Sequence, residues 1–495
     1  MGHSGEQFMR IVLAAWLLVG SSSLLCAAEP THSQAVSAIK RAVEFAQNKL
    51  AAGGGAYLWQ YASDLSEQEG EQKATATQGW TQPPGTPSVG EAFLEAYLVT
   101  GEPFLLEAAR KTGHALAAAQ LESGGWDYRI EFSPEAREAW RFRDEVERGA
   151  KISSKAKNVS TLDDDTTQSA LRFLMKLDVT LKQDDQRIHS TVEYALQSLL
   201  KAQYPNGAWP QRYSEFPDSK DFPVLKASYP DTWPREYPKA DYRSYYTFND
   251  DTLADMIDTM LLAGELYGES RYTAAAGKAG EFILLAQMPE PQPIWAQQYN
   301  AKMHPAWARK FEPASVTGGE SQGVIRILLH LFRRTGDKTF LEPIPRALNF
   351  LEEHELPGEP GRLSRFYELK TSRPLYFTKD TYILTYDDSN LPTHYGFKID
   401  SRVKRLRSEY DDAVKGGKDE RPLWTTTRKQ PEKISRLSLD AEQLIASLDS
   451  RGAWTEDGKL KASGNSTKPQ KIISMSTFAK NLARLSAFVA ATRQK

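Results

Sequence analysis

The sequence contains one cysteine among 495 residues, Cys26, and it lies in the apolar N-terminal segment. The rest of the chain therefore has no disulfide and no cysteine-ligated metal. The eight histidines are scattered without ligand spacing, which argues against a zinc centre. The P-loop, the dinucleotide fingerprint and His-Glu-x-x-His are all absent. Three common enzyme signatures are thus excluded.

The chain also lacks any excess of basic charge, because its net charge is -2 at pH 7. Nucleic acid is therefore not an expected partner. Arg10 precedes the apolar run IVLAAWLLVGSSSLLCAA, which Ala27 and Ala28 close. This pattern predicts a secretory signal over residues 1–28 and a secreted or periplasmic protein, with an uncleaved membrane anchor as the alternative. After processing we expect a monomer without a membrane partner, formed by one domain over residues 29–495.

An Ala-Gln pair, a Pro/Gly turn and a tryptophan recur along the chain. The tryptophans are Trp126, Trp209 and Trp295, separated by 83 and 86 residues. Each repeat predicts a helix, a short turn, a second helix and a loop. Helical hairpins of this length stack into a solenoid or close into a toroid. We expect an all-α fold, an α/α toroid of repeated helical hairpins with a few short strands in the long loops.

The inner helices are predicted to start near Val89, Asp165, Asp251 and Glu320, and the outer helices to span about 103–121, 184–203, 270–287 and 338–354. An early helix near 34–52 resembles the outer half of an incomplete unit. A late pair, 437–449 and 475–492, could complete the ring. Residues 60–88, 212–246 and 399–433 are predicted as loops, and 361–398 as a short hairpin.

Acidic clusters stand just ahead of several inner helices. Asp163-Asp164-Asp165 and Asn249-Asp250-Asp251 are the densest, and Glu91 and Glu320 occupy similar places. Helix capping explains one acid per site, since Asp and Asn favour the N-cap. It does not explain the extra carboxylates, which repel one another and favour a bound cation with oxygen ligands, such as Ca²⁺.

Basic residues lie near aromatic ones late in the chain. They are Arg309, Arg365, Arg373 and Lys379. A guanidinium matches a carboxylate with two parallel hydrogen bonds, so such residues could hold a polyuronate, although each alone is more often a surface or bracing charge.

The chain resembles the pectate lyases of polysaccharide lyase family 10, the pectic acid lyases. The strings that carry the resemblance run in family order from about Gly54 to Tyr386: QLESGGWDYRIEF, STLDDDTTQSALRFL, NGAWPQRY, YYTFNDDTLADMI, WARKFEPASVTGGESQG and RFYELKTSRP. The resemblance implies an α/α toroid that cleaves polygalacturonate by β-elimination with Ca²⁺.

The resemblance also implies roles for individual residues. Asp163 and Asp250 would bind the metal, with Asp164 and Asn249 as adjacent candidates for the site. Arg309 and Arg365 would bind substrate carboxylates. The base that removes the C5 proton would be Lys379 or, if the register shifts, Arg373. The loop between Ala202 and Thr247 is longer than the resemblance implies.

Two other functions remain open at this stage. One is a hydrolase or epimerase on a similar toroid, with paired carboxylates as acid and base. The other is a polyuronate-binding protein without catalysis, favoured if Lys379 cannot act as a base.

Overall fold

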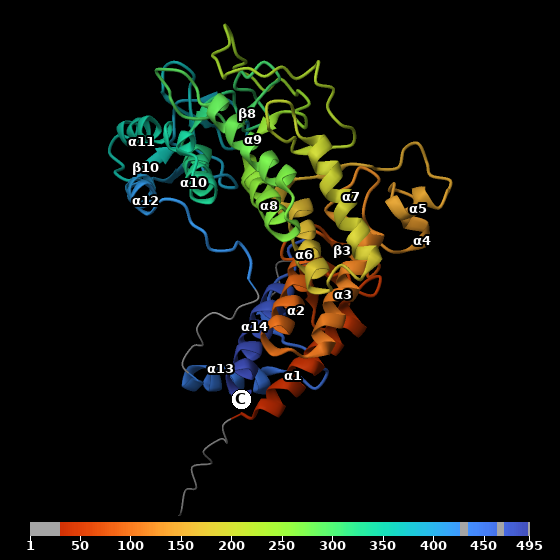
Figure 1. The fold of residues 1–495 in the computed structure, drawn as a ribbon. Coiled ribbons are helices and arrows are strands. Elements are labelled where there is room, and N and C mark those ends of the chain that lie inside the picture. The colour runs from red at the N-terminus through yellow and green to blue at the C-terminus, as the bar shows by residue number, and fades with distance from the viewer. Residues whose placement is uncertain (1–29, 426–433, 463–469, 494–495) are drawn as a thin grey trace, which may run out of the picture.

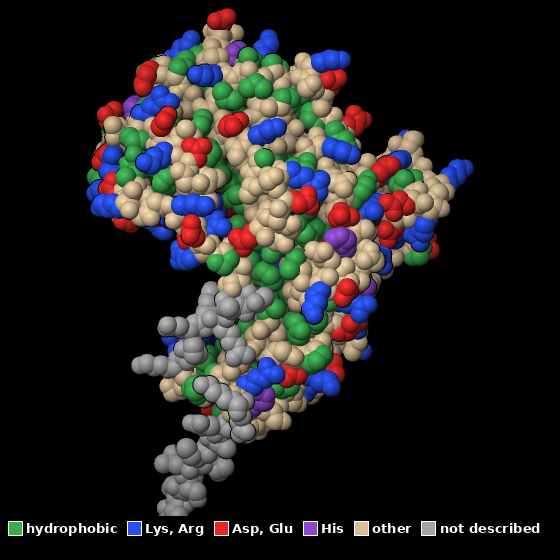
Figure 2. Space-filling view, viewed as in Figure 1, with side chains coloured by type: hydrophobic (Ala, Val, Ile, Leu, Met, Phe, Trp, Pro, Cys, Tyr) green, Lys and Arg blue, Asp and Glu red, His purple; other side chains and the backbone are tan. Residues whose placement is uncertain are grey.

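The computed structural model describes residues 30–425, 434–462 and 470–493. The predicted signal segment and Cys26 lie outside these residues. Within them, no helix is long and apolar enough to cross a membrane. On the face that Figure 2 shows, acidic and basic side chains are interspersed, which agrees with the net charge near zero.

The described chain forms an α/α toroid of helical hairpins, as expected. The inner helices α2 (Thr86–Thr100), α6 (Thr166–Thr180), α8 (Thr252–Tyr267) and α10 (Gly318–Thr335) lie side by side in this order along an arc (Figure 1). Their outer partners are α3 (Pro103–Ala118), α7 (Gln186–Ala202), α9 (Ser270–Ala286), and the short η4 (Lys338–Leu341) with α11 (Ile344–Glu353). The inner helices all begin at the same rim, because each outer helix returns the chain to it.

An apolar stripe on each inner helix explains this packing. On α8 the side chains of Leu253, Met256, Ile257, Met260 and Leu261 are buried, at the spacing that places them on one helix face. The expected helix bounds were right to within a few residues at most ends.

The late helical pair joins the start of the arc. Helix α14 (Met475–Thr492) packs against α2, and α13 (Ile434–Ser447) packs against α14. Helix α1 (His32–Phe45), continued by the π-helical turn Ala46–Leu50, packs on α14. The inner helix that pairs with α1 is therefore α14, the last helix of the chain. This explains why the unit that begins with α1 looks incomplete when the sequence is read from its start.

The prediction of a loop over 399–433 was wrong for its first half. Residues Val403–Gly416 form helix α12, which packs against α10 and α11. Its apolar contacts come from Val403, Leu406 and Ala413, all buried. Most other residues of α12 are charged, so the three apolar residues give only a weak helical periodicity in the sequence.

Each recurring tryptophan lies in the loop after an outer helix and forms a hydrogen bond with that helix. The indole Nε1 of Trp126, Trp209 and Trp295 donates to the carbonyl oxygen of Leu116, Leu199 and Ile283 on the preceding outer helix, at 2.8, 2.8 and 2.9 Å. Trp454 repeats the bond to Leu444 at 2.9 Å.

The glutamine of each Ala-Gln pair links neighbouring hairpins. The amide nitrogen of Gln120 donates to Gly124 in its own loop and to Thr191 on the next outer helix. Gln203 does the same with Gly207 and Ala275. Gln287 makes the same pair of bonds with Pro293 and Pro343. The repeated glutamine therefore hydrogen-bonds each hairpin to the next one.

Short antiparallel strands cover the rim where the inner helices begin. Three ladders have two strands each: β3 (Gln78–Trp80) with β4 (Arg129–Glu131), β5 (Ser160–Thr161) with β6 (Arg212–Tyr213), and β7 (Tyr246–Thr247) with β8 (Gln298–Tyr299). Each ladder joins the segment before an inner helix to the loop after an outer helix.

The remaining strands lie in the predicted hairpin region and beside the termini. The hairpin region contains β11 (Phe366–Tyr367), β12 (Pro374–Phe377) and β13 (Leu384–Thr385), in one sheet with β9 (Val316–Thr317), and β10 (Arg362–Ser364) paired with β14 (Lys398–Asp400). A second four-stranded sheet contains β1 (Gln60–Ala62), β2 (Gln68–Glu69), β15 (Glu456–Gly458) and β16 (Gln470–Ser474).

Candidate metal and polyanion site

The two dense acidic motifs have the same backbone conformation. Asp164 has φ 50° and ψ 38°, and Asp250 has φ 49° and ψ 41°. The next residues, Asp165 and Asp251, are also left-handed, at φ 57° and 54°. Non-glycine residues in this region cost about 1–3 kcal/mol each and concentrate at functional sites. Each motif thus contains two consecutive left-handed residues. Because the same strained conformation recurs in two repeats, we infer that it serves the function of the site.

The clusters do not cap their helices. The N-cap residues of α6 and α8 are Asp165 and Asp251, and neither side chain accepts a hydrogen bond from the helix. Of the other two acidic positions, Glu91 pairs with Lys176, whereas Glu320 lies in the first turn of α10, as the helix-dipole explanation expects, and pairs with Arg365. Helix capping is thus excluded as the explanation for the two motifs.

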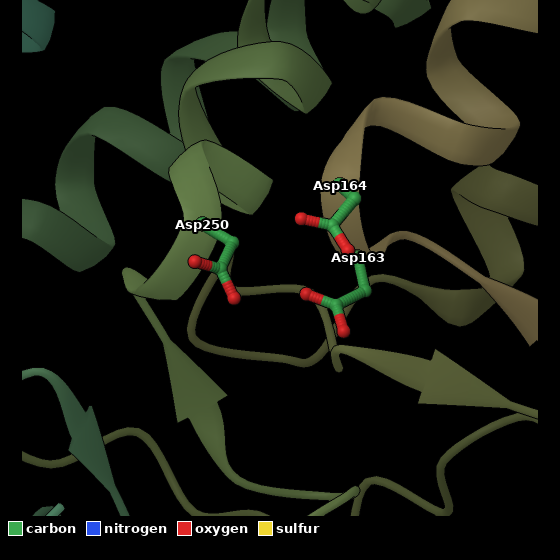
Figure 3. Close-up of side chains that lie close together, drawn as sticks. All are labelled: Asp163, Asp164 and Asp250. Carbon is green, nitrogen blue, oxygen red and sulfur yellow. The ribbon is translucent and has the colours of Figure 1, made fainter. Parts of the chain in front are cut away.

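The matching turns bring three carboxylates together. One oxygen atom each from Asp163, Asp164 and Asp250 lies within 4.8 Å of the others, and the three side chains point toward one another (Figure 3). Asp163 is buried, Asp164 is partly buried, and the Asp250 side chain is 35% exposed. An all-oxygen set of this kind suits a hard divalent cation.

The carboxylates are unfavourable to one another without a cation. Burial and the negative charge of Asp163 raise the pKa of Asp164. Burial raises the pKa of Asp250 to about 7; Arg309 opposes this rise, while Asp163 and Asp164 add to it. Neutralisation by a metal would relieve this repulsion.

Neutral donors orient the buried carboxylate. Gln211 Nε2 donates to Asp163 Oδ1 at 2.9 Å, and the Tyr128 hydroxyl donates to Asp163 Oδ2 at 2.9 Å. In the second motif Gln297 Nε2 donates to Asn249 Oδ1 at 2.9 Å. Asn249 thus occupies the position of Asp163, and Asp250 that of Asp164.

These supporting residues were not predicted, although the sequence holds a signal for them. Tyr128, Gln211 and Gln297 each stand two positions after a repeat tryptophan. Each of the three residues directly precedes a strand, β4, β6 or β8, and its side chain donates to Asp163 or Asn249.

Two guanidinium groups reach the carboxylates. Arg309 Nη2 lies 3.1 Å from Asn249 Oδ1 and 3.3 Å from Asp250 Oδ2, and it also pairs with buried Glu312. Arg212 Nη2 lies 3.2 Å from Asp163 Oδ2. Arg212 was not among the predicted residues. Both arginines line a cavity of about 400 Å³ together with Asp163 and Asp164.

The other predicted cations lie elsewhere. Arg365 pairs with Glu320 at 2.9 Å and lines a second cavity, of about 550 Å³, that Asp250 also borders. Arg373 is exposed, with its guanidinium 3.5 Å from the centre of the Tyr386 ring. Lys379 is exposed after β12 and, within the described chain, makes no hydrogen bond or ion pair with the three carboxylates. The structure therefore brings Arg309 to the cluster, but neither Lys379 nor Arg373.

The third acid of the first motif has a structural partner. Arg172 Nη2 lies 2.6 Å from both carboxylate oxygens of Asp165, and Nη1 donates to Thr259 Oγ1 at 3.1 Å. Burial and Asp165 raise the pKa of neighbouring Asp255 to about 7. Arg172 therefore holds the left-handed turn to two inner helices.

Replacing Arg172 by leucine should lower the free energy of unfolding by about 2–3 kcal/mol, because it leaves Asp165 without its cation. Urea unfolding of the metal-free protein measures this loss. The matched control is Arg187→Leu, which breaks a more exposed pair with Asp144 and should cost less than about 1 kcal/mol. Equal losses in the two variants would show that the Arg172 pair is no more than a surface contact.

Comparison with known proteins places the central region in a family. Residues 120–358 match the family model described as pectic acid lyase. This range includes the two acidic motifs and Arg309, and it confirms the resemblance. No curated protein matches the chain.

Solved structures with a similar arrangement act on several carbohydrates. A family 10 polysaccharide lyase from Cellvibrio cellulosa, a mutant in complex with trigalaturonic acid, is 18% identical with a TM-score of 0.43, over 66% of this chain and 98% of that one. A cellobiose 2-epimerase from Spirochaeta thermophila is 12% identical with a TM-score of 0.43, over 93% and 96%. A family 76 α-mannanase from Bacteroides thetaiotaomicron is 10% identical with a TM-score of 0.39, over 93% and 96%.

Proposed function

We propose that this chain, whose residues 120–358 match the pectic acid lyase family, is a polysaccharide lyase that cleaves polygalacturonate by Ca²⁺-assisted β-elimination. The observation that carries this proposal is the convergence of Asp163, Asp164 and Asp250 beside Arg309. The predicted signal over residues 1–28 supports action outside the cytoplasm. We propose that residues 29–495 form a single mature domain.

The carboxylate cluster fits the cation that the reaction needs. Asp163, Asp164 and Asp250 would hold Ca²⁺, with the Asn249 amide oxygen beside them. When bound, the ion would neutralise the cluster and stabilise negative charge on a substrate carboxylate. The hydrogen bonds from Gln211 and Tyr128 fix the orientation of Asp163.

Beta-elimination removes the C5 proton of a galacturonate unit, which is weakly acidic because it is α to the carboxylate. The C4=C5 double bond then forms as the C4–O4 glycosidic bond breaks, and the leaving oxygen takes up a proton. The base must stand within hydrogen-bond reach of that proton. Arg309 and Arg212 are the basic residues in contact with the carboxylates in the described chain. We therefore propose Arg309 for this role in place of Lys379 or Arg373, with Arg212 as the neighbouring cation on the substrate.

The charge around Arg309 sets a condition on this role. Burial lowers the pKa of Arg309, but hydrogen bonding and the charge of Glu312, together with Asp250, outweigh burial and raise it overall. A proton acceptor must be neutral when it acts. This role therefore requires a loaded site in which the charges of both Glu312 and Asp250 are compensated.

Absorbance of the unsaturated product distinguishes the three candidate functions. With polygalacturonate, we expect ultraviolet absorbance to rise with Ca²⁺ and to stop when a chelator is added. Reducing-sugar release without absorbance would instead support a hydrolase, and binding without either product would support a polyuronate-binding protein.

Stabilisation by Ca²⁺ should depend on pH. The folded pKa of Asp250, about 7, lies above its ordinary value. This group therefore stabilises the metal-free fold at low pH and loses that contribution as pH rises through about 7. At pH 5 Ca²⁺ must displace the proton, whereas at pH 8 it need not.

We therefore expect one fixed Ca²⁺ concentration, a hundredfold above the Kd at pH 8, to raise Tm by about 3–5 °C at pH 8 and by clearly less at pH 5, where the Kd is higher. Thermal unfolding followed by circular dichroism measures both shifts. Asp250→Asn should remove most of the difference. An equal Tm rise at both pH values in the unmodified protein would contradict the assignment of Asp250 as a ligand.

A further inference from the structure

The cavity that holds Asp163 and Asp164 extends to two cations without acidic partners. Its lining also includes Arg129 and Lys157. In the part of the chain that the structure describes, neither side chain forms an ion pair, whereas Arg212 and Arg309 in the same cavity both do. The lining also contains Glu71 and Asp127, but among the described residues neither forms an ion pair with Arg129 or Lys157, so these two cations lie unpaired beside the proposed metal position.

Arg129 is held in place by its strand and an aromatic ring. It lies on β4 opposite Trp80 of β3, with its guanidinium 5.5 Å from the centre of the Trp80 ring. Its Nη2 donates to Gln72 Oε1 at 3.0 Å, while its buried Nε has no hydrogen-bond partner. A buried donor without a partner is uncommon and is free for a ligand.

Lys157 is fixed through its backbone. Its amide donates to Ala139 at 2.8 Å, its carbonyl accepts from the Arg141 amide at 2.9 Å, and its ammonium lies 5.3 Å from the centre of the Trp140 ring. Trp140 is buried and donates to Asp127 Oδ2 at 3.0 Å. The backbone of Lys157 and the Trp140 ring are thus fixed, while the Lys157 side chain is exposed and free to reach a ligand.

We propose that Arg129 and Lys157 form a second carboxylate-binding subsite, which takes the uronate unit next to the one at the Asp163–Asp250 cluster. The proposal depends on the proposed function, since it assumes a polyuronate ligand. A free carboxylate accepts charge-assisted hydrogen bonds from both cations, and a methyl ester loses the charge. The subsite therefore makes the enzyme select unesterified galacturonate at this position.

The test compares Lys157→Met and Arg129→Gln with Lys155→Met. Lys155 is an exposed lysine two positions away that does not line the cavity. On polygalacturonate we expect KM to rise about 10- to 150-fold in each subsite variant, as for the loss of a hydrogen bond to a charged group, with kcat within about twofold. KM should not change in Lys155→Met, and Lys157→Arg should restore it. On highly methyl-esterified pectin the subsite variants should change KM little.

Two results would overturn the subsite. One is a KM on polygalacturonate equal to that of Lys155→Met, and the other is an equal rise in KM on both substrates. Calorimetric titration with trigalacturonate separates this proposal from the proposed function. If the unmodified protein forms no unsaturated product, the lyase function fails, and the titration still decides the subsite: weaker binding only in the Lys157 and Arg129 variants supports it, and unchanged binding refutes it.

Discussion

Replacing Asp163 by alanine is expected to abolish release of unsaturated product from polygalacturonate. Asp163 is the buried member of the carboxylate cluster, and Gln211, Tyr128 and Arg212 all donate to it. Its loss removes a proposed ligand and leaves those donors without an acceptor. We expect kcat/KM to fall at least about a thousandfold, which corresponds to about 4 kcal/mol.

The control for Asp163 is the acid at the end of the second motif. Asp251 stands next to Asp250 but is not part of the three-carboxylate cluster. Asp251→Asn should keep most of the activity, and circular dichroism should show that both variants are folded. If Asp163→Ala kept near-normal activity, Asp163 would not belong to the metal site.

Replacing Arg309 by alanine should cause a comparable loss of activity. Its guanidinium contacts Asn249 and Asp250, where a substrate carboxylate and its C5 proton would lie. We expect kcat to fall at least about a thousandfold. Arg309→Lys should recover part of this loss, with a changed pH profile for kcat, because an ammonium has a lower pKa than a guanidinium.

Lys379→Ala is the matched test of the alternative base. Lys379 is exposed and has no contact with the carboxylate cluster, so the variant should keep activity within about twofold. The opposite result, a large loss in Lys379→Ala with normal turnover in Arg309→Ala, would return the role of base to Lys379.

The hairpins were predictable because their signals are local. The apolar stripe of α8 and the repeated Ala-Gln pair with its tryptophan need no knowledge of distant residues. Helix α12 was not predicted, since only Val403, Leu406 and Ala413 contact the core and charged residues surround them. Its stability comes from α10 and α11, which a local pattern does not include.

The acidic motifs were predictable as a group, but their geometry was not. The sequence could not show that Asp164 and Asp250 occupy matching left-handed positions while Asp163 matches Asn249. It also could not show that Arg212 reaches Asp163 across 49 residues. Such contacts arise when β5 pairs with β6, because this pairing sets which side chains face the cluster.

The pairing of the first helix with the last affects how the protein is made. His32 on α1 hydrogen-bonds Thr492 on α14, 460 residues later. At roughly 5–20 residues per second, a ribosome needs about 20–90 s to cover that distance. During that interval the apolar face of α1, with Ala35, Ile39 and Ala42, lacks its main partner α14 and, among the described helices, has only α3 to pack against. The nascent N-terminal end of the toroid is therefore a target for chaperones until synthesis is complete.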